Sequence, residues 1–164
     1  MTSTPVAVLG FQCARPGAGA ELTRLNVELG MALSIPDLMR YQVLVREGDD
    51  CALCVYWLWR DIAHRDAVWA DPPAALSGFW AAARPLWRAD PDVRRFQWKP
   101  AQDRDLCPAG SGVVLDAAAE ADGEQLISID GGAALSCRAA AGRFNPRRWT
   151  AVWQKPSNQE RHGQ

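Results

Sequence analysis

The sequence predicts an α+β fold in which strands and helices follow one another in the order β-α-β-β-α-β. Two kinds of segment carry this prediction. Short stretches rich in β-forming residues occupy 5–13, 41–50, 51–59 and 93–99. Stretches with apolar residues every three or four positions occupy 20–39 and 74–87. This order is the split βαβ pattern of a ferredoxin-like domain, in which two helices pack on one face of a four-stranded antiparallel sheet.

The first strand and the first helix have clear boundaries. The stretch PVAVLGFQC at 5–13 runs into ARPGAGA, a cluster of chain-breaking residues. In the helix that follows, Leu22, Leu25 and Leu29 share one face until Ile35-Pro36. Because proline has no backbone N–H and clashes with the preceding turn, the helix is expected to end or kink there.

The next two strands are expected to form an antiparallel hairpin. YQVLVREGDD alternates apolar and polar residues and then reaches a polar turn at Gly48, and the strand at 51–59 follows directly. Asp61 supplies a side-chain oxygen that caps the helix after this hairpin. Pro72-Pro73 interrupts that helix, and a second helical piece with an apolar face covers 74–87.

Composition changes beyond Pro100, which divides the chain into two expected parts. Residues 1–100 form the ferredoxin-like domain, and 101–164 form a linker, a small β-rich C-terminal extension and a frayed tail. The extension contains four short β-leaning segments, VVLDAA, QLISIDGG, AALSCRAAAG and RRWTAVWQ. A meander is the simplest arrangement of these segments.

Composition also excludes several classes of function. The 18 basic and 19 acidic residues nearly cancel, which argues against nucleic-acid binding. The chain has no apolar run of 18 residues and no signal-like N-terminus, so we expect a cytoplasmic protein without a membrane partner. Five cysteines at irregular spacing favour reduced thiols, and no recognisable metal motif occurs.

Aromatic residues give the strongest hint of a site. The chain has eight tryptophans. In the strand at 51–59, Trp57 and Trp59 point to one face and Tyr56 to the other, so both faces are apolar. These rings are either core residues or, with Trp69 and Trp80 from the helices, walls of a pocket for a flat aromatic molecule.

Three charged side chains are candidates for chemistry. His64 is the only histidine outside the tail, and it is either a surface or capping residue or the acceptor of a substrate proton. Arg94 and Arg95 are neighbours on the last strand of the domain, so one of them should face the helices. A buried arginine would need an anion such as a substrate enolate, and a surface ion pair is the alternative.

The segment VYWLWRDIAHRDAVWADPP at 55–73 resembles the hallmark of the antibiotic biosynthesis monooxygenase family. In that family the third strand reads aromatic, x, Glu, x, Trp, x, Asp or Ser, and leads into a helix that closes with a small-residue or Ser-Pro step. Trp59 and Asp61 match, Asp71-Pro72 stands at the closing step, and Trp57 replaces the glutamate. The resemblance covers about residues 5–100 and implies a dimeric α+β barrel, with a second sheet supplied by a homodimer partner.

This resemblance implies a small oxygenase of natural-product biosynthesis. Its substrates would be O2 and a polycyclic phenol or hydroquinone of the anthrone type, as in polyketide pathways. It would use no metal or bound cofactor, or would use reduced flavin supplied by a partner reductase. Quinone-forming members carry an asparagine four residues before a helix tryptophan, where this chain has Arg65 before Trp69.

The expected roles and the open alternatives follow from that resemblance. His64 is the candidate base, and Arg65 or Arg95 is the candidate anion stabiliser. The expected pocket walls are Trp57, Trp59, Trp69, Trp80 and Tyr56. Two other functions stay open: a polyketide cyclase or isomerase of the same fold, and a non-catalytic ligand-binding or accessory protein whose residues 101–164 dock on a partner enzyme.

Overall fold

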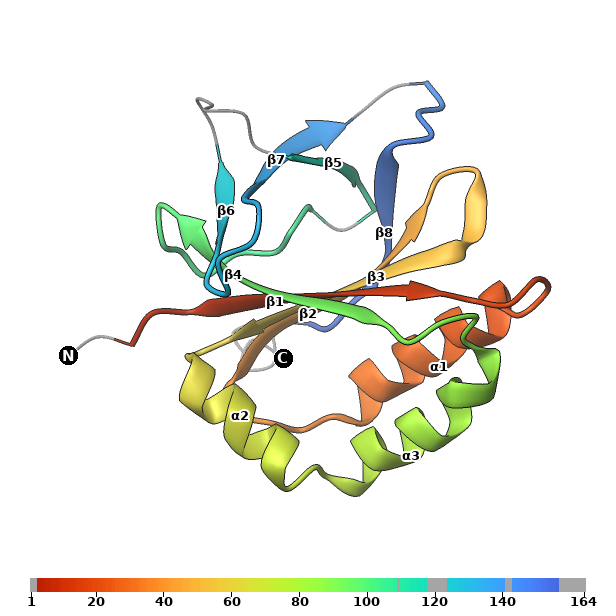
Figure 1. The fold of residues 1–164 in the computed structure, drawn as a ribbon, viewed down its shortest axis with the longest axis horizontal. Helices are drawn as coiled ribbons and strands as arrows, with labels where there is room; N and C mark the ends of the chain where they lie inside the picture. Colours follow the sequence, from red (N-terminus) through yellow and green to blue (C-terminus); the bar gives the residue numbers. More distant parts are fainter. Residues whose placement is uncertain (1–2, 109, 118–123, 141–142, 157–164) are drawn as a thin grey trace, which may run out of the picture.

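The computed structural model describes residues 3–108, 110–117, 124–140 and 143–156. In these residues eight strands form one closed antiparallel barrel in the order β1-β3-β2-β8-β5-β7-β6-β4. The three α-helices lie together on one side of the barrel (Figure 1). No helix within the described part of the chain is long and apolar enough to cross a membrane.

The first half of the chain has the predicted order of elements. The elements are β1 (Val6–Cys13), α1 (Gly19–Ala32), β2 (Leu38–Arg46), β3 (Asp49–Trp59), α2 (Ile62–Ala70), α3 (Ala74–Ala83), a 3-10 turn (Arg84–Leu86) and β4 (Asp92–Lys99). The β2–β3 hairpin is confirmed, and the sheet order β4-β1-β3-β2 is that of a ferredoxin-like domain. Helix α1 ends shortly before Pro36, as that proline predicts.

The second half of the chain closes the barrel, which corrects the expected dimeric arrangement. Its strands are β5 (Gly112–Ala117), β6 (Gln125–Ser128), β7 (Leu135–Ala140) and β8 (Arg148–Gln154). Strand β8 pairs with β2, and β6 pairs with β4, so both free edges of the first sheet are covered by the same chain. The covering sheet therefore comes from this chain rather than from a partner, and a homodimer stays a prediction that the barrel itself does not require.

The order of the last four strands also differs from a meander. Strand β5 pairs with β7 and with β8, and β6 lies between β7 and β4. These segments are not an appendage, since they contribute half of the strands of the barrel. The composition change noted at Pro100 coincides with the end of β4 at Lys99.

Apolar clusters lie on both faces of β1–β4. The barrel interior is filled by side chains such as Leu9, Leu44, Tyr56 and Phe96. Another core lies between the sheet and the helices, and its members include Val8, Leu29, Val55, Trp57, Trp59 and Leu76. Strand β3 is buried on both faces, as its apolar alternation predicts.

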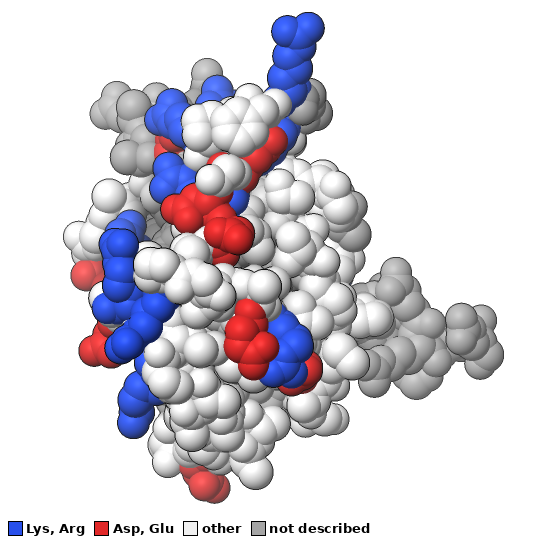
Figure 2. Space-filling view, turned by 90° about the vertical axis from the view of Figure 1, so that its right-hand side faces the viewer, with Lys and Arg blue, Asp and Glu red and all other residues white. Residues whose placement is uncertain are grey.

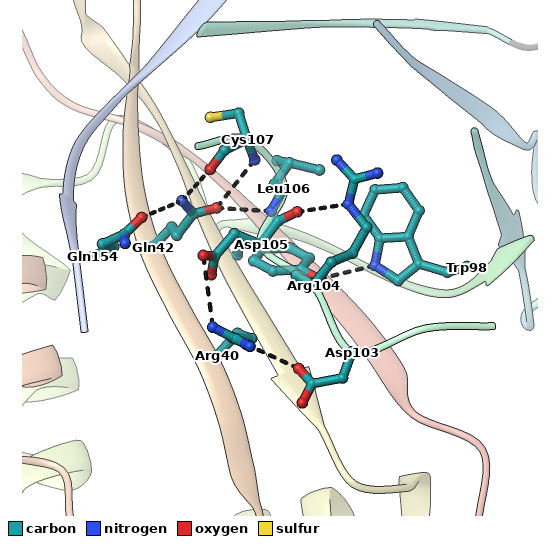
Figure 3. Close-up of polar contacts among 10 residues, drawn as sticks. Arg40, Gln42, Trp98, Asp103, Arg104, Asp105, Leu106, Cys107 and Gln154 are labelled. Carbon is teal, nitrogen blue, oxygen red and sulfur yellow. Dashed lines mark hydrogen bonds and ion pairs between the residues drawn. The ribbon is translucent and has the colours of Figure 1, made fainter. Parts of the chain in front are cut away.

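The segment expected to be a linker closes one end of the barrel. The amide of Gln42, which is fully buried, donates to the Cys107 carbonyl at 2.7 Å and accepts from the Leu106 N–H at 2.8 Å. Its Nε2 also donates to Gln154 at 3.0 Å (Figure 3). Leu106 and Cys107 are themselves buried, so this segment forms a plug in the barrel.

The residues just before this plug are held in place by ion pairs and by hydrogen bonds with aromatic side chains. Arg40 forms ion pairs with Asp103 at 2.9 Å and with Asp105 at 3.8 Å. The hydroxyl of Tyr56 donates to the Arg104 carbonyl at 2.7 Å and accepts from the Trp98 indole at 2.9 Å. A segment that looks like a linker by composition is therefore fixed by specific hydrogen bonds.

Gly30 marks a close contact between α1 and the side chains of the sheet. A Cβ added at Gly30 would lie 2.5 Å from Cζ3 of the partly buried Trp153 ring and 2.6 Å from Cε1 of the fully buried Tyr41 ring. We expect Gly30→Ala to lower the free energy of unfolding by about 1–3 kcal/mol, as overpacking does, although alanine favours a helix. Urea denaturation measures this change.

Gly78 in α3 provides the matched control. A Cβ at Gly78 would meet no atom within 4 Å. Gly78→Ala is therefore expected to raise the free energy of unfolding by about 0.5–1 kcal/mol through helix propensity alone. Equal effects of the two substitutions would contradict the close packing at Gly30.

Candidate functional site

A cavity of about 280 Å³ lies between the sheet and the helices. Strands β1, β3 and β4 form one wall, and α1, α2, α3 and the 3-10 turn after α3 form the other. Its aromatic lining consists of Trp57, Trp69, Phe79, Trp80 and Trp87. Broad indole faces with few hydrogen-bonding groups suit a flat, mostly apolar ligand.

The tryptophans of the wall support one another. The Trp69 ring stands edge-on to Trp57 at a centroid distance of 5.7 Å and to Trp80 at 5.8 Å. Trp59 stacks on Trp57 at 5.9 Å with the two planes 6° apart. Trp59 is fully buried and does not line the cavity, so it packs against the Trp57 ring and restricts the orientation of that ring.

An amide pair forms the polar end of the cavity. The side chains of Gln12 in β1 and Asn26 in α1 are buried and hydrogen-bond each other twice, at 2.9 Å and 3.2 Å. Asn26 also donates to the Leu22 carbonyl at 2.9 Å, and the Trp87 indole donates to Gln12 Oε1 at 3.0 Å. An amide nitrogen has two N–H donors and an amide oxygen has two lone pairs. Gln12 Nε2 therefore has one N–H left for a ligand, and Asn26 Oδ1 has one lone pair left.

Sequence patterns did not identify this amide pair. Gln12 lies in a stretch that is otherwise typical of a strand, and Asn26 lies on the buried face of α1 between Leu22 and Leu29. A polar residue at a position expected to be apolar was the available signal. Only the three-dimensional contact between the two amides shows that each satisfies the other.

The structure brings three of the five expected wall residues to this cavity. Trp57, Trp69 and Trp80 line it. Trp59 lies behind Trp57, and Tyr56 points to the other side of β3, into the barrel. Burial raises the pKa of Tyr56 well above its ordinary value, so its phenol stays protonated.

The expected catalytic residues do not meet at the cavity. His64 lies in the first turn of α2, where its Nδ1 is 2.7 Å from an oxygen of Asp61 and its side chain is 41% exposed. The carboxylate of Asp61 also accepts the His64 backbone N–H at 2.9 Å, which confirms the predicted helix cap. This hydrogen bond holds the pKa of Asp61 below its ordinary value.

The two arginines also lie outside the cavity. The Arg65 guanidinium lies 4.2 Å from the centroid of the Trp69 ring and pairs with Asp66 at 3.1 Å. Arg95 forms an ion pair with Asp130. Arg65 can therefore act on the cavity only through Trp69, and the roles assigned to these arginines stay predictions.

Arg84 is the ionisable residue among those that line the cavity. It is exposed, so it sits at the rim rather than among the indoles. In the described residues one cluster, Asp49, Asp50 and Cys51, could share a metal ion, but it lies at the β2–β3 turn and does not line the cavity.

Comparisons with known proteins find relatives by structure only. No protein family and no curated protein matches the sequence. A monooxygenase candidate from Fusobacterium nucleatum is 9% identical with a TM-score of 0.57, and the match covers 99% of this chain and 80% of that one. A monooxygenase candidate from Lactobacillus acidophilus is 12% identical with a TM-score of 0.51 and coverages of 98% and 80%.

A shorter neighbour matches part of the chain. An antibiotic biosynthesis monooxygenase candidate from Caulobacter crescentus is 14% identical with a TM-score of 0.51, and covers 63% of this chain and 92% of that one. The likeness is one of fold. The mixed α/β architecture, with its helices on one side of the sheet, is therefore shared with proteins named as monooxygenases, at identities too low to assign a reaction.

The position of His64 leads to a test of its expected role as base. Because its ring is held by Asp61 outside the cavity, we expect His64→Ala to leave turnover of a phenolic substrate within about twofold of wild type. Steady-state kinetics measures this. A loss of about tenfold or more, with ligand affinity kept, would instead establish His64 as the base.

Proposed function

We propose that the protein is a small oxygenase that oxidises a flat phenol or hydroquinone to a quinone. The observation that carries this proposal is the indole-lined cavity that ends in a buried, neutral amide pair. The fold shared with monooxygenase candidates supports it. The sequence resemblance suggests that the substrate is an anthrone-type molecule and that the reaction belongs to natural-product biosynthesis.

The cavity suggests how such a substrate would bind. The ring system would lie against Trp57, Trp69 and Trp80, with its oxygen accepting the remaining N–H of Gln12. A neutral donor at a water-poor site stabilises the phenolate or enolate more than it would in water. Arg84 at the rim would attract the anion, and the proton would leave to solvent.

The reaction balances without a cofactor. A deprotonated anthrone is electron-rich enough to reduce O2: a carbon–oxygen bond forms, and the resulting peroxide loses one water as the carbon becomes a carbonyl. For an anthrone the net change is replacement of a CH2 group by C=O, with O2 consumed and H2O released. A hydroquinone instead gives two electrons and two protons to O2, so one H2O2 is released for each quinone formed. The protein's part is to bind the ring, stabilise the anion and keep water from the intermediate.

The size of the cavity restricts the substrate. Its volume of about 280 Å³ lies just below the range of ligand pockets, which span roughly 300–1,000 Å³. Compact substrates with two or three fused rings are therefore favoured over larger polycyclic molecules.

Oxygen uptake is the decisive experiment. The purified, metal-free protein is given anthrone and 1,4-naphthohydroquinone in an oxygen-electrode cell, with and without reduced flavin, and the quinone is quantified by absorbance. One O2 consumed per anthraquinone formed, above the rate with heat-denatured protein, is the expected result. Quinone formation that occurs only with reduced flavin would assign a two-component system with a partner reductase.

Two outcomes would overturn the oxygenase. Ring closure or isomerisation of a polyketide-type substrate without O2 would indicate a cyclase or isomerase. Saturable quenching of tryptophan fluorescence by the same aromatics, with no conversion of any of them, would indicate a binding or accessory protein.

A further inference from the structure

A second cavity, of about 320 Å³, opens at the mouth of the barrel. Phe11 in β1 and Trp149 in β8 supply its aromatic surface, with ring centroids 5.7 Å apart. Arg46, Arg94 and Arg147 also line it. This mouth is at the opposite end of the barrel from the plug, since it involves the start of β4 and β8 whereas Trp98 and Gln154 at the plug lie near their ends.

Positive charge exceeds negative charge at this mouth. Arg94 is paired with Asp92 at 2.7 Å, and the single carboxylate of Asp116 is shared by Arg147 at 2.9 Å and Arg138 at 3.3 Å. The ion pairs found for the described residues give Arg46 no acidic partner; its Nε donates to the Pro146 carbonyl at 2.9 Å. Among the residues that line the cavity, three arginines therefore accompany one carboxylate, that of Asp116.

The arginines and the aromatic rings are arranged together. The Arg46 guanidinium carbon lies 5.9 Å from the centroid of the Trp149 ring, and that of Arg94 lies 5.5 Å from the Phe11 ring. Stacked guanidinium groups keep their N–H edges free for other acceptors. Strand β2 ends at Arg46, next to the β2–β3 hairpin on the right of Figure 1, and Figure 2 shows basic and acidic side chains close together on that side of the molecule.

We propose that the barrel mouth binds a small organic carboxylate, with its apolar part against Phe11 and Trp149 and its carboxylate on Arg46 and Arg147. Guanidinium groups bind carboxylates through two parallel hydrogen bonds, and the rings provide the apolar contact. The volume fits a metabolite rather than a polymer. This site is independent of the proposed oxygenase cavity, because Phe11 points to one face of β1 while Gly10 and Gln12 point to the other.

Binding of 2-naphthoate, with neutral 2-naphthamide as its isosteric control, tests the proposal. Each affinity is taken from the dependence of one resonance at the mouth on ligand concentration, so that binding in the indole-lined cavity is not counted. The indole N–H resonance of Trp149, assigned by its loss in Trp149→Phe, reports binding at the mouth. We expect 2-naphthoate to shift this resonance and to bind at least about tenfold more tightly than 2-naphthamide, since bonds to charged groups are the stronger ones.

Variants then separate the mouth from the rest of the surface. Arg46→Gln is expected to weaken naphthoate binding about tenfold, and Arg147→Gln, at a more exposed residue, about threefold. Arg24→Gln on α1 removes an exposed positive charge away from the mouth and should leave the affinity unchanged. If Arg46→Gln does not fold, Arg147→Gln alone carries the test, because its side chain is 67% exposed.

Three results would overturn the proposal. The first is equal affinity for the acid and the amide, and the second is unchanged affinity in the arginine variants. The third is loss of binding in Trp80→Ala, which would place the naphthoate in the other cavity.

Discussion

A Gln42→Leu variant is expected to lose about 3 kcal/mol of its free energy of unfolding. The substitution leaves the Leu106 N–H and the Cys107 carbonyl without their partner, and unsatisfied buried groups cost about 1–3 kcal/mol each. Both groups lie inside the barrel, where water cannot replace the amide. Urea denaturation monitored by tryptophan fluorescence measures the loss.

Gln154→Leu serves as the matched control for that variant. It removes one hydrogen bond, the one that Gln154 Oε1 accepts from Gln42, and Gln154 is only partly buried. We expect it to cost about 1 kcal/mol. If Gln42→Leu cost no more than this control, burial of Leu106 and Cys107 rather than the amide would hold the plug.

The second large effect is expected at the polar end of the indole-lined cavity. Gln12→Leu should lower kcat/KM for oxidation of an anthrone or hydroquinone about 100-fold, the usual effect of removing one donor to an oxyanion. The reason is that Gln12 Nε2 has the N–H left to stabilise the substrate anion. Initial rates of oxygen uptake over a range of substrate concentrations give this ratio.

Loss of activity by unfolding must be separated from loss of the donor. Gln12→Glu keeps an acceptor for the Trp87 indole but replaces the N–H by a negative charge, so it should lose as much rate. Gln97→Leu, on β4 outside the cavity, should keep the wild-type rate. A Gln12→Glu enzyme with wild-type kcat/KM would remove Gln12 from the mechanism.

Local features of the fold were predictable from the sequence. The β2–β3 hairpin follows from alternation around a short polar turn, and the α2 cap follows from the oxygen of Asp61. The closure of the barrel was not predictable in this way. It depends on pairs such as Val43 with Trp153, which are distant in sequence, and a free sheet edge accepts a strand from the same chain as readily as one from a partner.

The candidate site could likewise be predicted from the sequence only in part. Large apolar rings such as Trp57, Trp69 and Trp80 could be proposed as walls because indoles are rarely placed without a packing partner. His64 is chemically suitable as a base. A histidine three residues after a capping aspartate also fits the first turn of a helix, however, and the structure places His64 there. Gln12 and Asn26 form a site only as a hydrogen-bonded pair, and no sequence pattern predicts that these two residues meet.

Closure of the barrel by one chain has a thermodynamic consequence. A barrel assembled from two identical sheets repeats every site by its two-fold symmetry, and it dissociates when the protein is diluted. Here the two halves differ, since the helices and the indole-lined cavity belong to the first half alone. Closure of the barrel is therefore a unimolecular step: it needs no second copy of the chain, and each barrel carries a single such cavity.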